Sequence, residues 1–285
     1  MIQDNHFVES FCDNNISTHF KIKKILLQEQ SPWQKIEVVE TETVGKMLIL
    51  DGKTMISEHD EFIYHEVMSH IPYMASPKTR KVLIIGGGDG GMVREFVKHP
   101  EIDQIDLVEI DQRVIDVSKE FFPQCASGLD DPRVSIITKD GIEFVSQQKN
   151  KYDIIVIDST DPVDFAKGLF TDKFYKAVYN ALTDHGIMTA QTENIFYDEY
   201  GIKDIYDNLR RAFPVVQSFW GPIAIYPGVF WTYAFASKGI KGTDIIPEKR
   251  EHMKNVEKTC KWYNLEWHET AFKLSNLHKK MIGEV

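Results

Sequence analysis

Apolar side chains follow two different periods from Lys81 onwards. Short runs of β-branched residues bounded by turn residues alternate with longer stretches in which apolar residues recur every three or four positions. A short apolar run is typical of a strand buried on both faces, and the longer period is typical of a helix with one face on a core. The predicted strands are Val82–Ile85, Ile105–Ile110, Val134–Thr138, Tyr152–Asp158 and Ile187–Gln191, and the predicted helices are Met92–Lys98, Gln112–Phe121, Gly141–Gln147, Thr171–Ala181 and Asp198–Ala212. This alternation predicts a parallel sheet covered by helices.

The segments on either side of this region have other patterns. Val215–Trp220 and Trp231–Ser237 are predicted to close the sheet as an antiparallel pair, and the aromatic stretch from Glu248 to Leu277 is predicted to pack on the sheet edge. Residues 61–74 have a helical pattern, and residues 1–60 predict a small antiparallel β domain. Its strand-like segments are Phe20–Leu27, Gln34–Thr41, Met47–Leu50 and Thr54–Ile56, with a hairpin signal at Asp51-Gly52. These strands are few and short for an independent core, so we expect them to pack across a symmetric interface.

A glycine-rich turn follows the first predicted strand of the sheet. Residues 86–91 read GGGDGG directly after Val82–Ile85, and the helix Met92–Lys98 comes next. Strand, glycine turn and helix N-terminus form the layout of a nucleotide pocket at the carboxyl end of a strand. Glu109, at the end of the next strand, lies 21 residues after Gly88, which is the spacing at which a carboxylate meets a ribose.

The acid inside the turn narrows the class of nucleotide. A pyrophosphate would need backbone N–H groups and no negative charge at Asp89, so the turn disfavours a dinucleotide and a dehydrogenase. An acid there suits a nucleoside that carries positive charge, which points to S-adenosyl chemistry. The predicted fold is therefore α/β: a Rossmann-like sheet of the class I methyltransferase type with helices on both faces, preceded by the small antiparallel β domain.

Composition and charge exclude several other classes. The chain has 285 residues and a net charge of −10, which disfavours nucleic acid as a partner because phosphate binding needs a basic surface. Cys12, Cys125 and Cys260 are scattered, which predicts reduced thiols in a cytoplasmic protein. No signal-peptide pattern and no run near 18 apolar residues is present, so we expect no membrane association. His65 and His70 are five apart and fall on different faces of a helix, so we expect no metal site.

Several motifs, in order along nearly the whole chain, resemble those of the polyamine aminopropyltransferases. They are DEFIYHE at 60–66, the glycine turn with Asp89, VEID at 108–111, Asp140-Gly141, DSTDP at 158–162 and LFT at 169–171, with weaker similarity at Tyr226-Pro227, Trp231, Tyr263-Asn264 and HETAF at 268–272. The glycine turn and Glu109 are shared with methyltransferases, whereas DEFIYHE and DSTDP together are far more specific. The resemblance implies transfer of an aminopropyl group from decarboxylated S-adenosylmethionine to putrescine, which releases methylthioadenosine and spermidine. It also implies a homodimer or homotetramer, with residues 61–285 as the Rossmann-like catalytic domain and no tightly bound cofactor.

The resemblance also implies roles for residues on the donor side. The donor is a sulfonium with an ammonium tail and no carboxylate, and Asp89 can pair with that ammonium. Glu109 would hold the ribose hydroxyls, and Asp140 would accept from the adenine amino group, with Gly141 allowing close approach of the backbone. Gln34 would contact the nucleoside from the N-terminal sheet.

On the acceptor side, one amine nitrogen of the diamine must lose its proton before it attacks the carbon next to sulfur. Asp158 ends a buried apolar strand, where desolvation and neighbouring acids raise a carboxylate's pKa towards that of a base, so it is the expected catalytic residue. Asp161 and Tyr64 would orient the amine. The remaining residues expected to line the acceptor site are His65, Ser159, Thr160, Gln191 and Tyr226.

Two loops depart from the family pattern. After Asp161-Pro162 the family usually carries a glycine-proline pair, but this chain has VDFAKG at 163–168, and after Tyr226-Pro227 it has Gly228-Val229 where a small residue and then glycine are usual. Cadaverine, agmatine or a longer polyamine therefore stay open as acceptors. Two other functions also stay open: a class I methyltransferase acting on a small amine, and a polyamine-binding paralogue without turnover.

Overall fold

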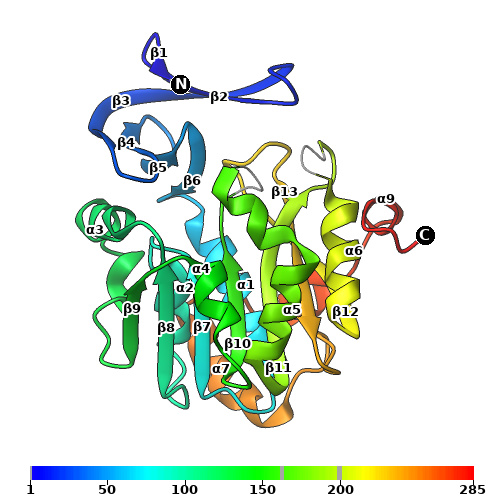
Figure 1. The fold of residues 1–285 in the computed structure, drawn as a ribbon. Helices are drawn as coiled ribbons and strands as arrows, with labels where there is room; N and C mark the ends of the chain where they lie inside the picture. Colours follow the sequence, from blue (N-terminus) through cyan, green and yellow to red (C-terminus); the bar gives the residue numbers. More distant parts are fainter. Residues whose placement is uncertain (1, 161–163, 198–200) are drawn as a thin grey trace.

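Two β-sheets make up the fold (Figure 1). The structure is a computed structural model that describes residues 2–160, 164–197 and 201–285. In the first sheet, six strands follow one another in sequence order and each neighbouring pair is antiparallel. These strands are β1 (Ile2–Gln3), β2 (His6–Phe11), β3 (Ile16–Gln30), β4 (Lys35–Thr41), β5 (Lys46–Leu50) and β6 (Lys53–Ser57).

The N-terminal sheet is larger than the sequence predicted. The last three strands match the predicted segments, but β1 and β2 were missed and β3 is 15 residues long. The expectation of few and short strands was therefore wrong. Alternate side chains of β2 are buried, Phe7, Glu9 and Phe11. One of those three is a carboxylate, so the apolar alternation in the sequence was too short to stand out.

The second sheet has the order β12-β13-β11-β10-β7-β8-β9. The five strands from β11 to β9 are parallel, and β13 and β12 form an antiparallel pair at the edge, as predicted. The strands are β7 (Lys81–Gly86), β8 (Gln104–Glu109), β9 (Val134–Thr138), β10 (Tyr152–Asp158), β11 (Leu182–Asn194), β12 (Val215–Pro222) and β13 (Phe230–Ser237). The helices are α1 (Glu61–Ala75), α2 (Gly91–Phe96), α3 (Gln112–Phe121), α4 (Gly141–Ser146), α5 (Asp172–Ala181), α6 (Ile202–Ala212), α7 (Arg250–Val256), α8 (Leu265–Ala271) and α9 (Asn276–Met281). The expected start of α6 at Asp198 lies outside the described residues.

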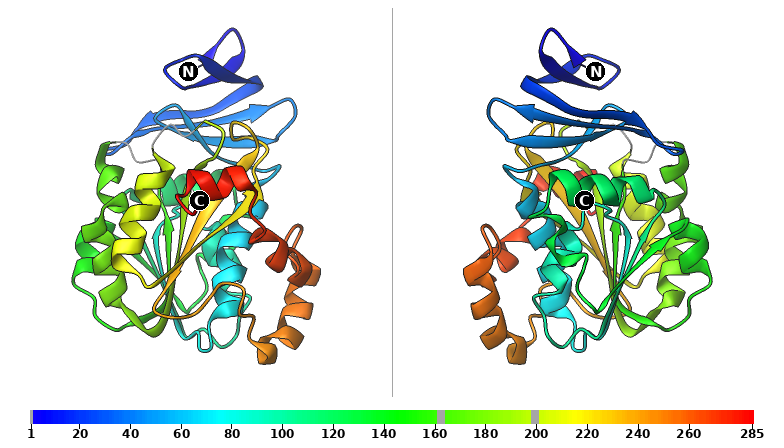
Figure 2. Two further views of the ribbon diagram at one scale, coloured as in Figure 1. Left: turned by 90° about the vertical axis from the view of Figure 1, so that its right-hand side faces the viewer. Right: turned by 90° about the vertical axis from the view of Figure 1, so that its left-hand side faces the viewer.

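Helices cover both faces of this sheet (Figure 2). Because side chains alternate along a strand, Val82 and Ile84 of β7 enter one core with α1 and α2, and Leu83 and Ile85 enter the other with α5 and α6. Both faces of the central strands β7, β8 and β10 are therefore buried, as their continuous apolar runs predicted, whereas the edge strand β9 is partly exposed. The fold is the predicted Rossmann-like α/β fold with a preceding antiparallel sheet. Among the described residues, no helix combines the length and the apolar character that crossing a bilayer requires.

The N-terminal sheet lies across the carboxyl ends of the parallel strands, at the top of Figure 1. Ile36, Val38 and Leu48 of this sheet form a small core with Val114 and Val117 of α3. This packing fixes the N-terminal sheet above the turn that follows β7, which is where the sequence places its candidate site.

The C-terminal segment closes one side of the larger sheet. Trp267 of α8 packs against Trp220 of the edge strand β12, with ring centroids 5.0 Å apart, so the prediction that residues 248–277 pack on the sheet edge is confirmed for α8. The part around α7 instead contacts α1 and the segment after α2, through Lys249 with Tyr73 and His252 with His99. The segment is also tied to α1, because the buried Glu66 carboxylate accepts hydrogen bonds from the backbone N–H groups of residues 261–263 at 2.8–2.9 Å. Tyr64 and His65, the two residues before Glu66 on α1, line the space between the two sheets.

Candidate active site

One cavity lies between the two sheets, at the carboxyl ends of β7, β8 and β10. It collects every predicted site residue that the structure describes. These are Gln34, Tyr64, His65, Asp89, Glu109, Asp140, Gly141, Asp158, Ser159, Thr160, Gln191 and Tyr226. Asp161, the remaining predicted residue, lies outside the described residues.

The glycine turn allows strand ends to approach closely. Gly86 has a φ of 80°, and a Cβ added there would lie 2.0 Å from the carbonyl oxygen of Asp158. Only glycine fits this position, because it needs both the left-handed conformation and the space. The backbone N–H of Gly88 then donates to Glu109 Oε2 at 3.2 Å, so the 21-residue spacing corresponds to a direct contact.

Glu109 is held at the back of the cavity by backbone groups. Its Oε1 also accepts from the Asp111 N–H at 2.9 Å. Burial and the charge of Asp111 raise the pKa of Glu109 to about 7, against the lowering effect of these hydrogen bonds. Asp111 in turn accepts from Ser31 Oγ at 2.6 Å and from Gln34 Nε2 at 3.1 Å. The N-terminal sheet therefore reaches the end of β8 through polar contacts that the sequence did not reveal.

Asp140 and Gly141 lie at the rim of the cavity. Asp140 is exposed and is the N-cap of α4, with its Oδ1 accepting from the Ile142 N–H at 2.7 Å. A Cβ on Gly141 would lie 2.3 Å from Ile85, so this position needs a residue without a side chain. The start of α4 thus packs tightly against the end of β7.

Asp158 stands at the end of β10 and contacts α1. The Tyr64 hydroxyl donates to Asp158 Oδ1 at 2.7 Å, whereas Asp158 Oδ2 is buried and has no hydrogen-bond partner among the described residues. Burial and the charge of Asp89 raise the pKa of Asp158 to about 7, against the opposing effects of His65 and the Tyr64 hydrogen bond. A carboxylate with this pKa can gain and lose a proton near neutral pH.

His65 lies between two carboxylates. Its Nδ1 is 2.6 Å from Glu61 Oε2 and its Nε2 is 3.1 Å from Asp89 Oδ1. Burial alone would lower the pKa of His65, but the two carboxylates raise it to about 10. Burial would likewise raise the pKa of Asp89, but His65 and the Gly91 N–H lower it to about 2. His65 and Asp89 are therefore an imidazolium and a carboxylate at neutral pH. The His65 ring also packs against the start of α2, where a Cβ on Gly91 would lie 2.2 Å from it.

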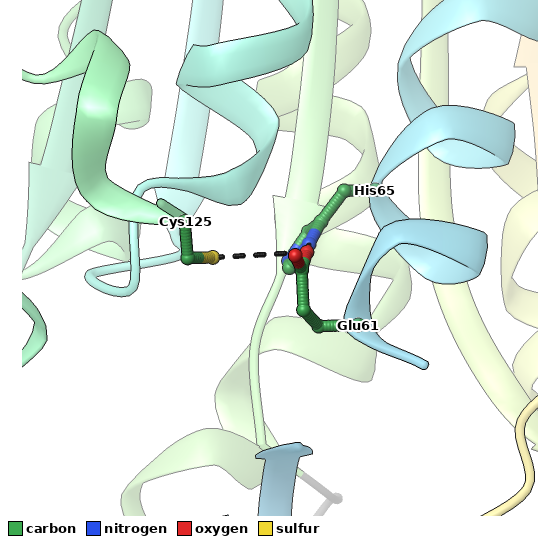
Figure 3. A group of neighbouring side chains, drawn as sticks. All are labelled: Glu61, His65 and Cys125. Carbon is green, nitrogen blue, oxygen red and sulfur yellow. Dashed lines mark hydrogen bonds and ion pairs between the residues drawn. The ribbon is translucent and has the colours of Figure 1, made fainter. Parts of the chain in front are cut away.

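A network behind His65 was missed by the sequence analysis. Figure 3 shows Glu61, His65 and Cys125, whose side chains converge from α1 and from the loop after α3. Arg94 of α2 donates to both oxygens of Glu61, at 2.7 and 2.9 Å. Burial and the carboxylates of Asp89 and Glu61 raise the pKa of the Cys125 thiol, so the sulfur stays protonated and can donate to Asp89 Oδ1 at 3.4 Å. A metal ion would need a thiolate and would compete with the Arg94 guanidinium, so we interpret this group as a hydrogen-bonded network.

The other side of the cavity is formed by β11, β13 and the loop before β13. Gln191 Nε2 donates to the Ser159 carbonyl at 3.3 Å, and Gln191 Oε1 accepts from Trp231 Nε1 at 3.2 Å. Trp231 packs edge-on against Tyr226 with ring centroids 4.6 Å apart, and the Tyr226 hydroxyl donates to the Met55 carbonyl at 2.8 Å. These contacts form a continuous wall from the end of β10 to the N-terminal sheet.

Gly228 and Val229, where the sequence departs from the family pattern, form a turn next to this wall. Val229 has a φ of 62°, in the left-handed region that favours glycine, and follows Gly228 at 70°. Its N–H donates to the Tyr226 carbonyl at 3.1 Å, which holds the turn in place. A β-branched residue therefore has a left-handed backbone conformation beside Tyr226.

Fold and cavity together define a class of enzyme: a Rossmann-like transferase whose acidic pocket suits a positively charged nucleoside. Residues 61–245 match the family model for the spermine/spermidine synthase domain, and residues 7–58 match the model for the spermidine synthase tetramerisation domain. The chain belongs to the spermine/spermidine synthase family.

Known relatives resemble the chain over nearly its full length. The polyamine aminopropyltransferase of Thermotoga petrophila is 42% identical over 279 residues, covering 97% of this chain and 93% of that one. Polyamine aminopropyltransferase 1 of Aquifex aeolicus is 41% identical over 264 residues, covering 93% and 92%. A solved spermidine synthase in complex with the transition state analogue AdoDATO superposes with a TM-score of 0.94 at 40% identity, covering 100% of this chain and 97% of that one. The Thermotoga maritima spermidine synthase superposes with a TM-score of 0.91 at 38% identity, covering 100% and 96%.

Proposed function

We propose that the protein transfers the aminopropyl group of decarboxylated S-adenosylmethionine to putrescine, giving spermidine and methylthioadenosine, the reaction of a spermidine synthase. The observation that carries this proposal is the Asp158 carboxylate, which lines the cavity with a pKa of about 7 beside the ionised Asp89. A base that titrates near neutral pH and a fixed anion are the two groups that an amine nucleophile and a cationic donor require.

The donor would occupy the side of the cavity formed by β7, β8 and α4. Asp89 would pair with the ammonium of its aminopropyl tail, sharing the carboxylate with His65. Glu109 would accept from the ribose hydroxyls, and the exposed Asp140 would accept from the adenine amino group. Gln34, fixed by Asp111, would contact the nucleoside from above.

The acceptor would lie along the wall that runs from Asp158 to Tyr226. Tyr64 holds Asp158 Oδ1, which leaves Oδ2 to take a proton from the attacking amine. Asp161 would orient the same amine, and Gln191 and Tyr226 would contact the carbon chain and its second amine. Ser159, Thr160 and His65 would complete the lining.

The step is a displacement at carbon. The ammonium of the acceptor gives a proton to Asp158, and the nitrogen lone pair attacks the methylene carbon bonded to sulfur. The new N–C bond forms as the C–S bond breaks, and its electron pair neutralises the sulfonium, so that methylthioadenosine leaves as a neutral thioether. The new secondary amine keeps two protons as an ammonium, and Asp158 releases the proton that it accepted to solvent, which restores the base. Holding nucleophile and electrophile in one cavity supplies much of the rate enhancement.

Mass spectrometry of products tests the proposal. The protein is incubated with decarboxylated or intact S-adenosylmethionine and a panel of putrescine, cadaverine, agmatine and spermidine. We expect an aminopropylated product and methylthioadenosine only with the decarboxylated donor. A methylated amine formed from the intact donor would instead identify a methyltransferase, and binding without any product would identify a non-catalytic paralogue.

The oligomeric state of the protein and its location in the cell are part of the same proposal. The match of residues 7–58 to a tetramerisation domain supports self-association, for which we propose a homodimer or homotetramer. We also propose that residues 1–60 and 61–285 act as two structural units and that the protein works in the cytoplasm.

A further inference from the structure

Acidic residues dominate the lining of the cavity. They are Glu9, Asp60, Glu61, Asp89, Glu109, Asp140, Asp158 and Glu193. Lys53 is the only lysine or arginine among the described residues that line it. The other cation of the lining, the His65 imidazolium, lies between the carboxylates of Glu61 and Asp89. A second fixed cation in a pocket for polycationic substrates calls for an explanation, because it repels the ligands that the acids attract.

Lys53 is held in one place by the N-terminal sheet. Its Nζ lies 3.8 Å from Glu9 Oε1, donates to the Ser10 carbonyl at 3.4 Å and stands 5.0 Å from the centre of the Phe11 ring. Glu9 is buried on β2, and its other oxygen accepts from the Thr54 N–H at 3.0 Å. The pair therefore presents an ammonium and a carboxylate together, not an anion alone.

The pair stands at the opposite end of the acceptor wall from Asp158. The wall runs from Ser159 through Gln191 and Trp231 to Tyr226, whose hydroxyl reaches the Met55 carbonyl. Met55 follows Thr54, the residue that donates to Glu9. An acceptor with its reacting amine at Asp158 extends along this wall towards Lys53.

We propose that Lys53 determines acceptor length by closing the far end of the cavity to an additional ammonium group. This inference rests on the proposed function and specifies its acceptor. A diamine places its second ammonium on the wall, where Glu193 lines the same cavity two residues after Gln191. A triamine would bring a further ammonium up to Lys53, where like charges oppose each other in a partly buried site. The protein's own product is a triamine, so Lys53 limits the reaction to a single transfer.

Two substitutions separate charge from size at this position. Lys53→Met keeps an unbranched side chain only one atom shorter and removes its charge, and Lys53→Arg keeps the charge. Lys23→Met is the matched control, because Lys23 forms a 3.9 Å ion pair with Glu40 on the same sheet, is exposed and does not line the cavity. For each protein, kcat and KM are measured with putrescine and with spermidine as acceptor, products are assigned by mass spectrometry, and thermal melting monitors folding.

The wild type, Lys53→Arg and Lys23→Met should all prefer putrescine over spermidine by at least about tenfold in kcat/KM. Lys53→Met should raise the spermidine-to-putrescine ratio by about tenfold or more, mainly through a lower KM for spermidine. A ratio in Lys53→Met within twofold of the wild type would overturn the inference, as would a wild type that uses both acceptors equally. These results leave the proposed function standing, whereas a wild type that transfers no aminopropyl group to any acceptor overturns the proposed function itself.

Discussion

The two carboxylates of Asp89 and Asp158 share one cavity but differ in charge state. His65 keeps the pKa of Asp89 at about 2, and burial beside that anion raises the pKa of Asp158 to about 7. One acid thus stays an anion for a cationic ligand while its neighbour exchanges a proton. Pairs of acids whose environments separate their pKa values are typical of acid–base sites.

Replacing the proposed base should affect turnover more than binding. Asp158→Asn keeps the acceptor for the Tyr64 hydroxyl but cannot take a proton, so we expect kcat to fall by roughly 10²–10⁴-fold. Wild-type turnover should rise with pH through about 7 as Asp158 deprotonates, and also as more diamine reaches the free-base form. The variant should retain only the second dependence. Steady-state kinetics across pH 5.5–9 measure turnover and its pH dependence, and calorimetry with methylthioadenosine measures binding of the nucleoside.

Asp161→Asn is the companion variant, and it should act mainly on the KM for the diamine. Turnover of Asp158→Asn within a few-fold of the wild type at saturating substrates would contradict the assignment. Loss of the chemical step in Asp161→Asn alone would mean that the neighbouring acid is the base.

The same carboxylate should have a measurable effect on stability. The pKa of Asp158 is higher in the folded protein than in the unfolded chain, so the folded state loses stability as pH rises from about 4 through about 7. Asp158→Asn should therefore raise the melting temperature, and more at pH 8 than at pH 5. Asp172→Asn is the control. Lys176 lowers the pKa of that exposed carboxyl, so this substitution should not raise the melting temperature at either pH. Equal melting temperatures of wild type and Asp158→Asn at pH 8 would contradict the claim that burial of the ionised Asp158 carboxylate destabilises the folded protein.

Asp89 should select the donor. The carboxylate of intact S-adenosylmethionine would meet this ionised side chain, whereas the decarboxylated donor brings only its ammonium. We expect calorimetry to show a preference for the decarboxylated donor on the order of 10²-fold, and Asp89→Asn to reduce that preference. Equal affinities of the wild type for the two donors would exclude this role.

At the scale of elements, α1 connects the cavity to the C-terminal segment. Tyr64 and His65 face the cavity, and Glu66 accepts three backbone N–H groups from residues 261–263. Glu66→Ala would leave these buried donors without their acceptor, so the free energy of unfolding should fall by about 2–4 kcal/mol in urea denaturation. Glu269→Ala, an exposed position on α8, should change it by less than about 0.5 kcal/mol. A loss in Glu66→Ala no larger than in the control would show that the segment is held by other contacts.

The sequence predicted best the strands that are covered by helices on both faces. Strands such as β7 and β10 are apolar at nearly every position, because helices cover both of their faces. The strand β11 extends to Asn194, beyond the predicted end at Gln191, because its last residues are polar and buried against β13 and the cavity. No apolar pattern marks such a strand end, and the buried Glu9 obscured β2 in the same way.

Contacts within the candidate site also differ in whether the sequence alone could predict them. Gly88 lies in the turn after β7 and Glu109 ends the adjacent strand β8, so sequence spacing alone places them in contact. Arg94 and Glu61, or Lys53 and Glu9, come from separate elements that only the tertiary fold brings together. A lysine after a hairpin turn resembles any exposed turn residue, and its place in the cavity follows only from the tertiary fold.

At the scale of the whole molecule, the N-terminal sheet has one face on the larger domain and exposes apolar residues elsewhere. Ile25 of β3 is 42% exposed, within the segment that matches a tetramerisation domain. We expect light scattering at micromolar concentration to show a dimer or tetramer, and Ile25→Lys to shift it towards smaller species. Val285→Lys, at the exposed C-terminus, should leave the assembly unchanged. A stable wild-type monomer would contradict the expectation.

The position of the N-terminal sheet above the carboxyl ends of the parallel strands has a consequence for how such enzymes diversify. Glu109 ends a strand of the larger sheet, and Asp89 and Asp140 lie in turns that follow its strands, whereas Glu9 and Lys53 come from the first sixty residues. Recombination between relatives at the junction before α1 would exchange only the Lys53 end of the acceptor wall. The nucleoside end and the wall from Asp158 to Tyr226 would be inherited intact, provided that the contacts of Ser31 and Gln34 with Asp111 are kept. New polyamine products can then arise by swapping a module that takes no part in the bond-making step.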